Sequence, residues 1–273
     1  MSKNEQVSVE ERVKNEKHSY NKKIDRRKYN AAFGHAQGGY PYTRRNKIYA
    51  SVLKKEKNKR ILEIGSTSWK KFVNFKEYCP SKLVCINISE IELEKGRKIA
   101  KESETKNHEF KVMDAHNLEF PDNSFDIIFG QEILHHLDIA VFAKEAARVL
   151  EEEGQIVFVE PLGGNPVGKL VRWLTPTKRT DFEEPLNRKH LKALAKYFDL
   201  DLAYNQLFYV PFGALSKFIF KSPRNPLTFI AYKLDRLIEM TFGKIGFGVY
   251  FRQVVIKGKL KKQQPRKQQP RKQ

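Results

Sequence analysis

The chain has 273 residues, of which 40% are hydrophobic, and its 52 Lys and Arg residues against 32 Asp and Glu give a formal net charge of +20. This length can bury one core with a small cap, and no run of eighteen apolar residues could span a bilayer. The charged amino terminus lacks the apolar segment of a signal peptide, so we expect a cytoplasmic protein. Cys79 and Cys85 are too few for a disulfide framework, and both are expected to behave as small apolar residues.

The positive charge lies at the two ends of the chain. Residues 1–60 carry 17 basic and 6 acidic residues, and residues 251–273 carry 9 basic and no acidic residues, so these flanks contribute +11 and +9. The body between them has 26 residues of each sign, with a net charge of −7 over residues 61–160 and +7 over residues 161–250. Basic charge that lies only at the ends of the chain is weak evidence for nucleic-acid binding. RNA is therefore a possible partner but not the favoured one.

Residues 1–45 are expected to form an amino-terminal arm. The first 30 residues are polar and have no sustained periodicity. Three glycines and a proline interrupt the segment 31–45, which predicts a loop that carries His35, Tyr40 and Tyr42. This loop is either a connection with aromatic plugs or a lid over a binding site.

From Arg60 the chain alternates short apolar runs with helical patterns, which is typical of βαβ units and a mostly parallel sheet. Strands are predicted near 60–64, 83–87, 109–113, 125–130, 155–160, 202–209 and 250–258, and helices near 70–78, 89–102, 139–150 and 187–198. Residues 46–260 would form one domain with cap insertions at 161–186 and 210–248. Residues 261–273 would form a disordered basic tail.

The second insertion contains a helical pattern over residues 226–242. Seven residues share one face at helical spacing, namely Leu227, Ile230, Ala231, Leu234, Leu237, Ile238 and Thr241. A cap helix packed on the core is one interpretation of this stripe. A face that docks on a membrane or a partner is the other.

Three motifs fall where strands of such a sheet should end. ILEIG ends at Gly65, Asp114 follows about fifty residues later, and PDNSFDIIFGQEILHHL covers residues 121–137. Open α/β sheets bind nucleotide-like ligands at the carboxyl ends of their strands, so the order and spacing of these motifs predict such a site. The first loop lacks the GxGxxG pattern, which argues against a dinucleotide dehydrogenase.

The series ILEIG, LVCINIS, VMDAHNLEFPDNSFDIIFGQEILHHL and ARVLEEEGQIVFVEP resembles the class I S-adenosylmethionine-dependent methyltransferases, particularly the branch that modifies small molecules and lipids. The resemblance covers about residues 55–210. It implies an α/β fold with a Rossmann-like, seven-stranded, mostly parallel sheet, whose last strand is antiparallel and whose two faces carry helices. It also implies S-adenosylmethionine as the cofactor and no metal.

The resemblance implies cofactor-binding roles for eight residues. They are Glu63, Gly65 and Thr67 toward the amino-acid end, Asn87 at the ribose, Asp114 and Ala115 at the adenine, and Gly130 and Gln131 beside the sulfonium. The sequence departs from the family in two places. No glycine follows Gly65 in the run GSTSW, where Trp69 is bulky, and Asn87 occupies the position of the family's ribose-binding acid.

Methyl transfer to a hydroxyl needs an aligned nucleophile and a group that takes its proton. His135 and His136 follow the fourth strand and are the candidate bases, while Glu160, at the end of the fifth strand, would orient a base or the acceptor. His116 and His190 are expected to be surface or capping residues.

The leading hypothesis is methylation of a small acceptor. That acceptor could be amphipathic or membrane-linked, with the protein peripheral at the inner face of the membrane. The apolar residues between 206 and 250 would then line a pocket or rest on a bilayer, and nearby basic residues would attract anionic lipid. Two alternatives stay open: RNA or protein methylation that uses the basic flanks, and a non-catalytic binding protein of the same fold.

We predict that the tail after about Leu260 is dispensable for folding. The repeat QQPRKQQPRKQ offers no apolar side chain to bury other than proline. Truncation there should shift the melting temperature by no more than about two degrees. A larger drop in a thermal unfolding experiment would mean that the tail docks on the body.

Overall fold

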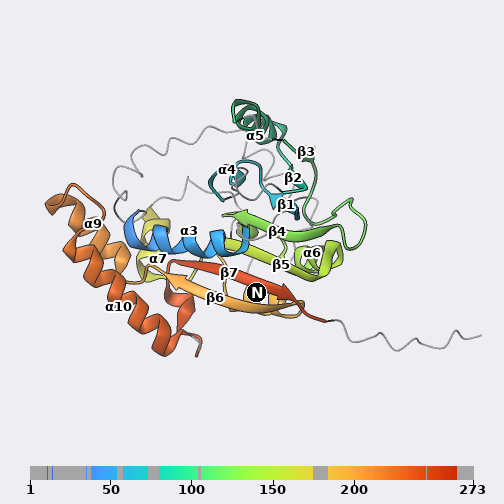
Figure 1. Ribbon diagram of the computed structural model, residues 1–273. Helices are drawn as coiled ribbons and strands as arrows, with labels where there is room; N and C mark the ends of the chain where they lie inside the picture. Colours follow the sequence, from blue (N-terminus) through green and yellow to red (C-terminus); the bar gives the residue numbers. More distant parts are fainter. Residues whose placement is uncertain are drawn as a thin grey trace, which may run out of the picture.

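Strands β1–β7 form one sheet in the order β3-β2-β1-β4-β5-β7-β6 (Figure 1). The computed structural model describes residues 38–53, 58–72, 80–103, 106–174, 184–243 and 245–262, together with positions 11, 14 and 35. Strands β1 to β5 are parallel to one another, and β7 runs antiparallel to both β5 and β6. The predicted Rossmann-like sheet with an antiparallel last strand is therefore confirmed.

Strands β1 to β4 agree closely with the predicted ranges, whereas the bounds of β5, β6 and β7 differ from the prediction by several residues. They are β1 Arg60–Ile64, β2 Lys82–Asn87, β3 His108–Val112, β4 Phe125–Gln131, β5 Leu150–Pro161, β6 Phe198–Asn205 and β7 Gln253–Leu260. Strands β1, β2 and β4 are almost continuous apolar runs, because both faces of a parallel sheet are covered.

Helices cover both faces of the sheet (Figure 1). The described helices are α3 Gly39–Leu53, α4 Trp69–Phe72, α5 Glu90–Glu102, α6 Ile139–Val149, α7 Pro166–Leu174, α8 Arg188–Ala195, α9 Tyr209–Ile219 and α10 Pro226–Phe242, with 3-10 turns η2 Leu134–His136 and η4 Phe247–Tyr250. Side chains of α6 and α8 pack on one face of the sheet, whereas those of α3, α4 and α5 pack on the other.

Helix α3 corrects the prediction of a loop for residues 39–45, whereas most of residues 31–37 lie outside the described part of the chain. The helix begins at Gly39, whose φ of +70° is one that residues with a side chain rarely adopt. A Cβ at this position would also lie 2.1 Å from the hydroxyl of Tyr209. Pro41 lies in the first turn, where its missing N–H removes no helical hydrogen bond. Tyr40 and Tyr42 therefore lie on a helix.

Strand β6 corrects a second prediction, because it covers residues 198–205 instead of 202–209. Its first residue, Phe198, pairs with Leu260 at the end of β7. From Tyr209 the chain forms α9, a helix that the sequence did not predict. The backbone amides of Leu207, Phe208 and Tyr209 donate hydrogen bonds to Asp235 of α10, which caps the start of α9.

The second predicted insertion thus contains α9 and α10. Together with α7, these helices lie on the side of the sheet at which the parallel strands end (Figure 1). At the other boundary, the Lys261 amide donates to the carbonyl of Tyr197 at 2.9 Å. A truncation that tests the tail is therefore best placed after Lys262.

Arg44 of α3 connects the sheet to α10 through hydrogen bonds. Its guanidinium donates to the Tyr204 carbonyl at 2.8 Å and to the Asn205 side chain at 3.0 Å, both at the end of β6. It also forms a 2.9 Å ion pair with Glu239 of α10, which is buried. One side chain therefore links three elements that are distant in the sequence.

We predict that Arg44→Ala lowers the free energy of unfolding by about 2–4 kcal/mol, because it removes three hydrogen bonds and one partner of a buried ion pair. Lys47→Ala is the matched control, since Lys47 is exposed on the same helix. Urea denaturation of both variants provides the measurement. Equal stabilities of the two variants would contradict the role given to Arg44.

Candidate functional site

The residues predicted to bind a cofactor lie along one edge of the sheet. Ile64 of β1 is in register with Ile86 of β2 and with Gly130 of β4, and Asn87 is in register with Val112 of β3. Four neighbouring parallel strands therefore end side by side. The segments that follow them carry the predicted residues.

The loop after β1 is shaped by the buried carboxylate of Glu63. One carboxylate oxygen accepts hydrogen bonds from the backbone amides of Ser68 at 2.7 Å and Trp69 at 3.3 Å, and the other accepts from the thiol of Cys85 at 3.2 Å. Burial raises the pKa of Glu63 to about 7, although these hydrogen bonds oppose the shift. Glu63 is fully buried, so it acts on a ligand through the loop that it holds.

The loop after β1 packs closely on α5. Gly96 of α5 lets that helix approach the loop, since a Cβ there would lie 2.4 Å from the Ser66 carbonyl. The hydroxyl of Ser66 donates to the carbonyl of Glu92 on the same helix at 2.9 Å. Trp69 is 1% exposed and packs in the core beneath the sheet, so its bulk does not cover the loop. Thr67 is half-buried within it.

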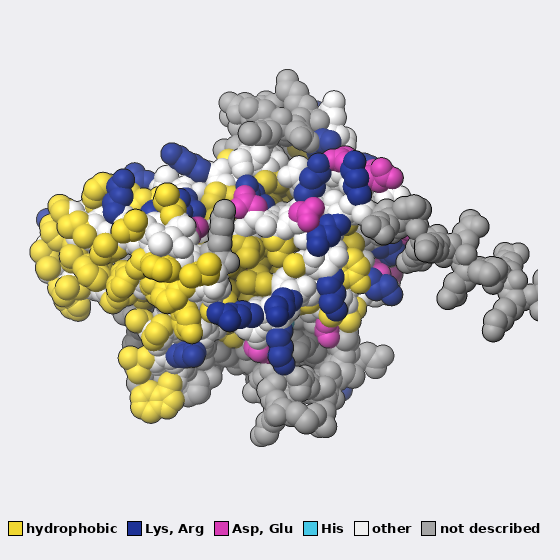
Figure 2. Space-filling view, turned by 90° about the horizontal axis from the view of Figure 1, so that it is seen from below, with side chains coloured by type: hydrophobic (Ala, Val, Ile, Leu, Met, Phe, Trp, Pro, Cys, Tyr) yellow, Lys and Arg dark blue, Asp and Glu magenta, His cyan; other side chains and the backbone are white. Residues whose placement is uncertain are grey.

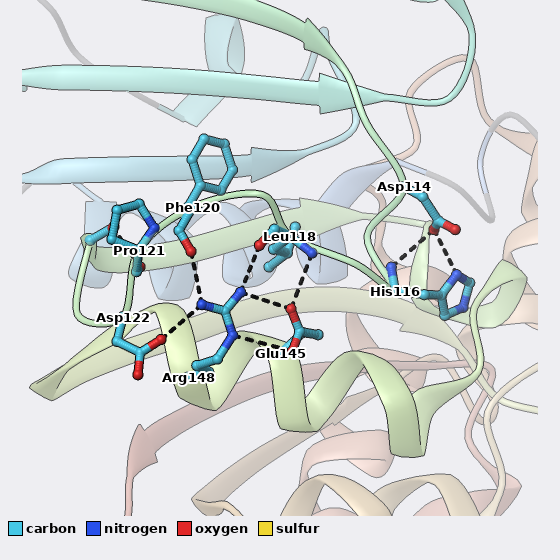
Figure 3. A network of polar contacts seen from close by, with 9 residues as sticks. Asp114, His116, Leu118, Phe120, Pro121, Asp122, Glu145 and Arg148 are labelled. Atoms are coloured by element: carbon cyan, nitrogen blue, oxygen red, sulfur yellow. Dashed lines mark hydrogen bonds and ion pairs between the residues drawn. The ribbon is translucent and has the colours of Figure 1, made fainter.

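Asp114 and His116 form a hydrogen-bonded pair after β3 (Figure 3). An Asp114 oxygen accepts from the His116 amide at 2.9 Å and contacts its Nδ1 at 2.7 Å. The His116 Nε2 accepts from the amide of Asp138, the residue that caps α6. Burial favours the neutral form of Asp114, but the contacts with His116 outweigh it and lower the pKa of the carboxyl. Asp114 is thus an anion that is only partly covered, at 30% side-chain exposure.

The segment after this pair is held by Arg148 of α6 (Figure 3). Its guanidinium donates to the carbonyls of Leu118 and Phe120 at 2.6 and 2.8 Å, and it pairs with Asp122 and Glu145. This network fixes the main chain that leads from Asp114 to β4. His116 is buried and links this segment to α6, which differs from the expected surface position, whereas His190 takes part in the capping box of α8 as expected.

The end of β4 is packed tightly. A Cβ on Gly130 would lie within 2.9 Å of Ile64, Ile133 and Phe158, so only glycine fits. The Gly130 carbonyl accepts a hydrogen bond from the hydroxyl of Tyr49 on α3.

The remaining predicted cofactor-binding residues lie on the same edge. Gln131 is half-buried at the end of β4, and Ala115 is buried after β3. Asn87 accepts a 2.9 Å hydrogen bond from the amide of Ser89 through its side-chain oxygen, which fixes the turn after β2.

Glu160 and His135 form a second buried pair. Glu160 is fully buried and accepts hydrogen bonds from the amides of Ile133 and Leu134, each at 2.9 Å, and it contacts His135 Nδ1 at 2.7 Å. This contact favours the tautomer with its proton on Nδ1, which leaves Nε2 as the basic nitrogen. The His136 ring lies 4.2 Å from that of His135 and is more exposed. Glu160 is therefore a positioning residue for His135.

Arg45 is a residue of this edge that the sequence pattern did not reveal. It lies one helical turn before Tyr49, is 8% exposed, and its Nε has no hydrogen-bond partner among the described residues. Burial lowers the pKa of its guanidinium, and the charge of Glu132 opposes this shift. A buried guanidinium of this kind is available to an anionic group of a ligand. Only the tertiary packing of α3 brings it to the end of β4.

Comparison with known proteins agrees with this geometry. Residues 62–158 match the family model described as a methyltransferase domain. The glycine/sarcosine/dimethylglycine N-methyltransferase of Actinopolyspora halophila is 27% identical over 142 residues, which cover 50% of this chain and 23% of that protein. The uncharacterized methyltransferase YcgJ of Bacillus subtilis (strain 168) is 32% identical over 104 residues, which cover 37% of this chain and 40% of that protein. The chain thus spans less than half the length of either relative.

Among solved structures, geranyl diphosphate C-methyltransferase from Streptomyces coelicolor A3(2) is similar in fold. Its TM-score is 0.56 at 13% sequence identity, over 80% of each chain. The sheet order and the shared edge are those of a Rossmann-like fold similar to this methyltransferase structure. Residues 62–158, which carry most of that edge, are similar to a methyltransferase domain.

We predict that the stability difference between wild type and Glu63→Gln depends on pH. The folded state holds the Glu63 proton up to a pKa of about 7, whereas the unfolded chain releases it near 4.5. Wild type therefore loses stability as pH rises through this window, and the variant, which cannot ionise there, does not. The variant should gain up to about 3 kcal/mol relative to wild type.

Urea denaturation at several pH values between those two pKa values measures this difference. Glu152→Gln is the control, because Glu152 is exposed and its variant should follow wild type. A stability difference for Glu63→Gln that stays constant with pH would contradict the burial of an ionisable Glu63.

Proposed function

We propose that the chain is an enzyme that transfers a methyl group from S-adenosylmethionine to a small acceptor. The observation that carries the proposal is the shared edge at which the segments with Glu63, Asn87, Asp114 and Gly130 meet. This edge lies within the part of the chain that the methyltransferase family model matches. The relatives support a small acceptor, since their names specify amino-acid N-methylation and geranyl diphosphate C-methylation.

In this proposal the cofactor lies across the ends of β1 to β4. The loop that Glu63 holds offers backbone amides to the amino-acid end, and Asn87 faces the ribose. The carboxylate of Asp114 accepts from the exocyclic amine of the adenine, which suits its lowered pKa and partial exposure. The Ala115 amide meets the adenine ring, while Gly130 and Gln131 lie beside the sulfonium.

The chemistry needs few groups. A lone pair of the acceptor forms a bond to the methyl carbon while the bond from carbon to sulfur breaks, and those electrons remain on sulfur as a neutral thioether. The proton of an acceptor hydroxyl or amine passes to a base, for which we propose His135, held by Glu160. His136 is the neighbouring candidate.

We further propose that the acceptor is amphipathic or membrane-linked, with the protein peripheral to a membrane. Residues 161–250 carry a net charge of +7, and 15 of the described large hydrophobic side chains in that range are exposed. The RNA hypothesis depends on the basic flanks, most of which lie outside the described residues. The non-catalytic hypothesis rests on the glycine-poor loop GSTSW after β1.

We predict that the full chain binds S-adenosylmethionine and S-adenosylhomocysteine, and that Asp114→Ala weakens both by about tenfold or more, the scale of one charge-assisted hydrogen bond. Isothermal titration calorimetry measures the affinities. Glu119→Ala is the control, because Glu119 is exposed on the same segment. Melting temperatures of both variants separate lost binding from lost folding, since Asp114 also holds His116.

Absence of binding to wild type up to millimolar ligand would overturn the enzymatic proposal. Binding without turnover on any acceptor, by contrast, would favour the non-catalytic alternative.

A further inference from the structure

Helix α10 turns its acidic side chains toward the protein and its apolar side chains toward solvent. Asp235 and Glu239 are 3% and 8% exposed, whereas Leu237 and Met240 are 62% and 70% exposed. A surface helix ordinarily buries its apolar stripe. The interpretation of residues 226–242 as a cap helix packed through that stripe is therefore wrong for its outer residues, and Ala231 is the one stripe residue that is fully buried.

Hydrogen bonds fix this inverted orientation. Asp235 accepts from the amides of Phe208 and Tyr209 at 2.6 and 3.3 Å, which ties α10 to the start of α9. Glu239 accepts from the Tyr204 amide at 2.8 Å and pairs with Arg44. Rotation of α10 to bury its apolar side would leave these carboxylates and amides without partners. Such unmade buried hydrogen bonds are costly, so the apolar side stays outside.

Helix α9 extends the same exposed surface. We call the combined surface the α9–α10 face, and its exposed apolar residues are Leu215, Phe218, Ile219, Phe229, Ile230, Leu234, Leu237 and Met240. Phe218 alone is 86% exposed. Figure 2 shows hydrophobic side chains gathered over the part of the molecule where these helices lie. Contiguous exposed apolar surface of this kind marks an interaction site.

The charges around the face select its partner. Between residues 209 and 243 both acidic side chains are buried, and the exposed charged residues are all basic: Lys217, Lys221, Arg224 and Lys233. A second copy of the chain would set like charges opposite one another. An anionic bilayer offers both an apolar interior and negative headgroups. No helix in the described part of the chain is long and apolar enough to cross that bilayer.

We propose that the α9–α10 face docks on the surface of an anionic membrane. The apolar side chains enter the boundary between headgroups and acyl chains, and the four lysine and arginine side chains contact lipid phosphates. Helix α9 begins just beyond the end of β6, so docking places the cofactor edge close to the bilayer. This consequence, access to a membrane-linked acceptor, rests on the proposed function. The docking itself does not.

Vesicle co-sedimentation with the full chain tests the proposal. The vesicles contain phosphatidylcholine with or without phosphatidylglycerol, and 0.5 M NaCl screens the basic flanks, which are the same in every variant. The apolar variant combines Phe218→Gln, Leu237→Gln and Met240→Gln, and its control is Ile91→Gln, an exposed residue of α5. The basic variant combines Lys217→Gln, Lys221→Gln and Lys233→Gln, and its control combines Lys98→Gln, Lys101→Gln and Lys196→Gln.

We expect wild type to sediment with phosphatidylglycerol vesicles at both salt concentrations. The apolar variant should bind at least tenfold more weakly, and at low salt the basic variant should bind phosphatidylglycerol vesicles more weakly than its control of equal net charge. Both controls should bind as wild type does. The substituted side chains are exposed, so all variants should keep the melting temperature of wild type.

Two outcomes would overturn the proposal. If the apolar variant binds vesicles as wild type does, the basic flanks alone account for the binding. Light scattering provides the second outcome. If wild type is a dimer, and the apolar variant is a monomer that binds vesicles as wild type does, the face is an interface between copies. Calorimetry with S-adenosylmethionine measures cofactor binding independently of vesicle binding and of dimer formation. Vesicle binding without cofactor binding would therefore refute the proposed function and leave the docking proposal intact.

Discussion

Buried carboxyl groups that accept hydrogen bonds from backbone amides fix both the edge of the sheet and the start of the α9–α10 face. Glu63 organises the loop after β1, Glu160 the turn after β4, and Asp235 the start of α9. A buried carboxyl group is tolerated only where hydrogen-bond partners surround it, so each of these groups imposes one conformation on the chain that it contacts. The edge of the sheet and the α9–α10 face depend on the same kind of interaction.

Helix α3 couples these two regions. Its Tyr49 contacts the Gly130 carbonyl at the end of β4, its Arg44 pairs with Glu239, and its Tyr40 stacks on Tyr232 of α10. The helix thus spans from the proposed site of chemistry to the proposed membrane surface. Arg44 of α3 forms hydrogen bonds with both β6 and α10. A shift of α10 on docking would therefore be transmitted through α3 to the edge of the sheet.

The fold by itself leaves the acceptor open. Proteins of the same architecture at 13–16% identity include geranyl diphosphate methyltransferases and a [4+2]-cyclase, so the sheet supports different reactions. Helices α3, α9 and α10 lie outside the part of this chain that the family model matches.

The sequence alone determined the sheet, because strand periodicity and the positions of Gly65, Asp114 and Gly130 depend only on local patterns and their spacing. It did not determine α3, since Gly39 and Pro41 are residue types typical of loops. The start of this helix depends on packing against Tyr209, which is distant in the sequence. Nor could it orient α10: an apolar stripe indicates one face of a helix but not which face meets the core. Distant partners decided that question, because Asp235 and Glu239 accept hydrogen bonds from β6, α3 and the start of α9.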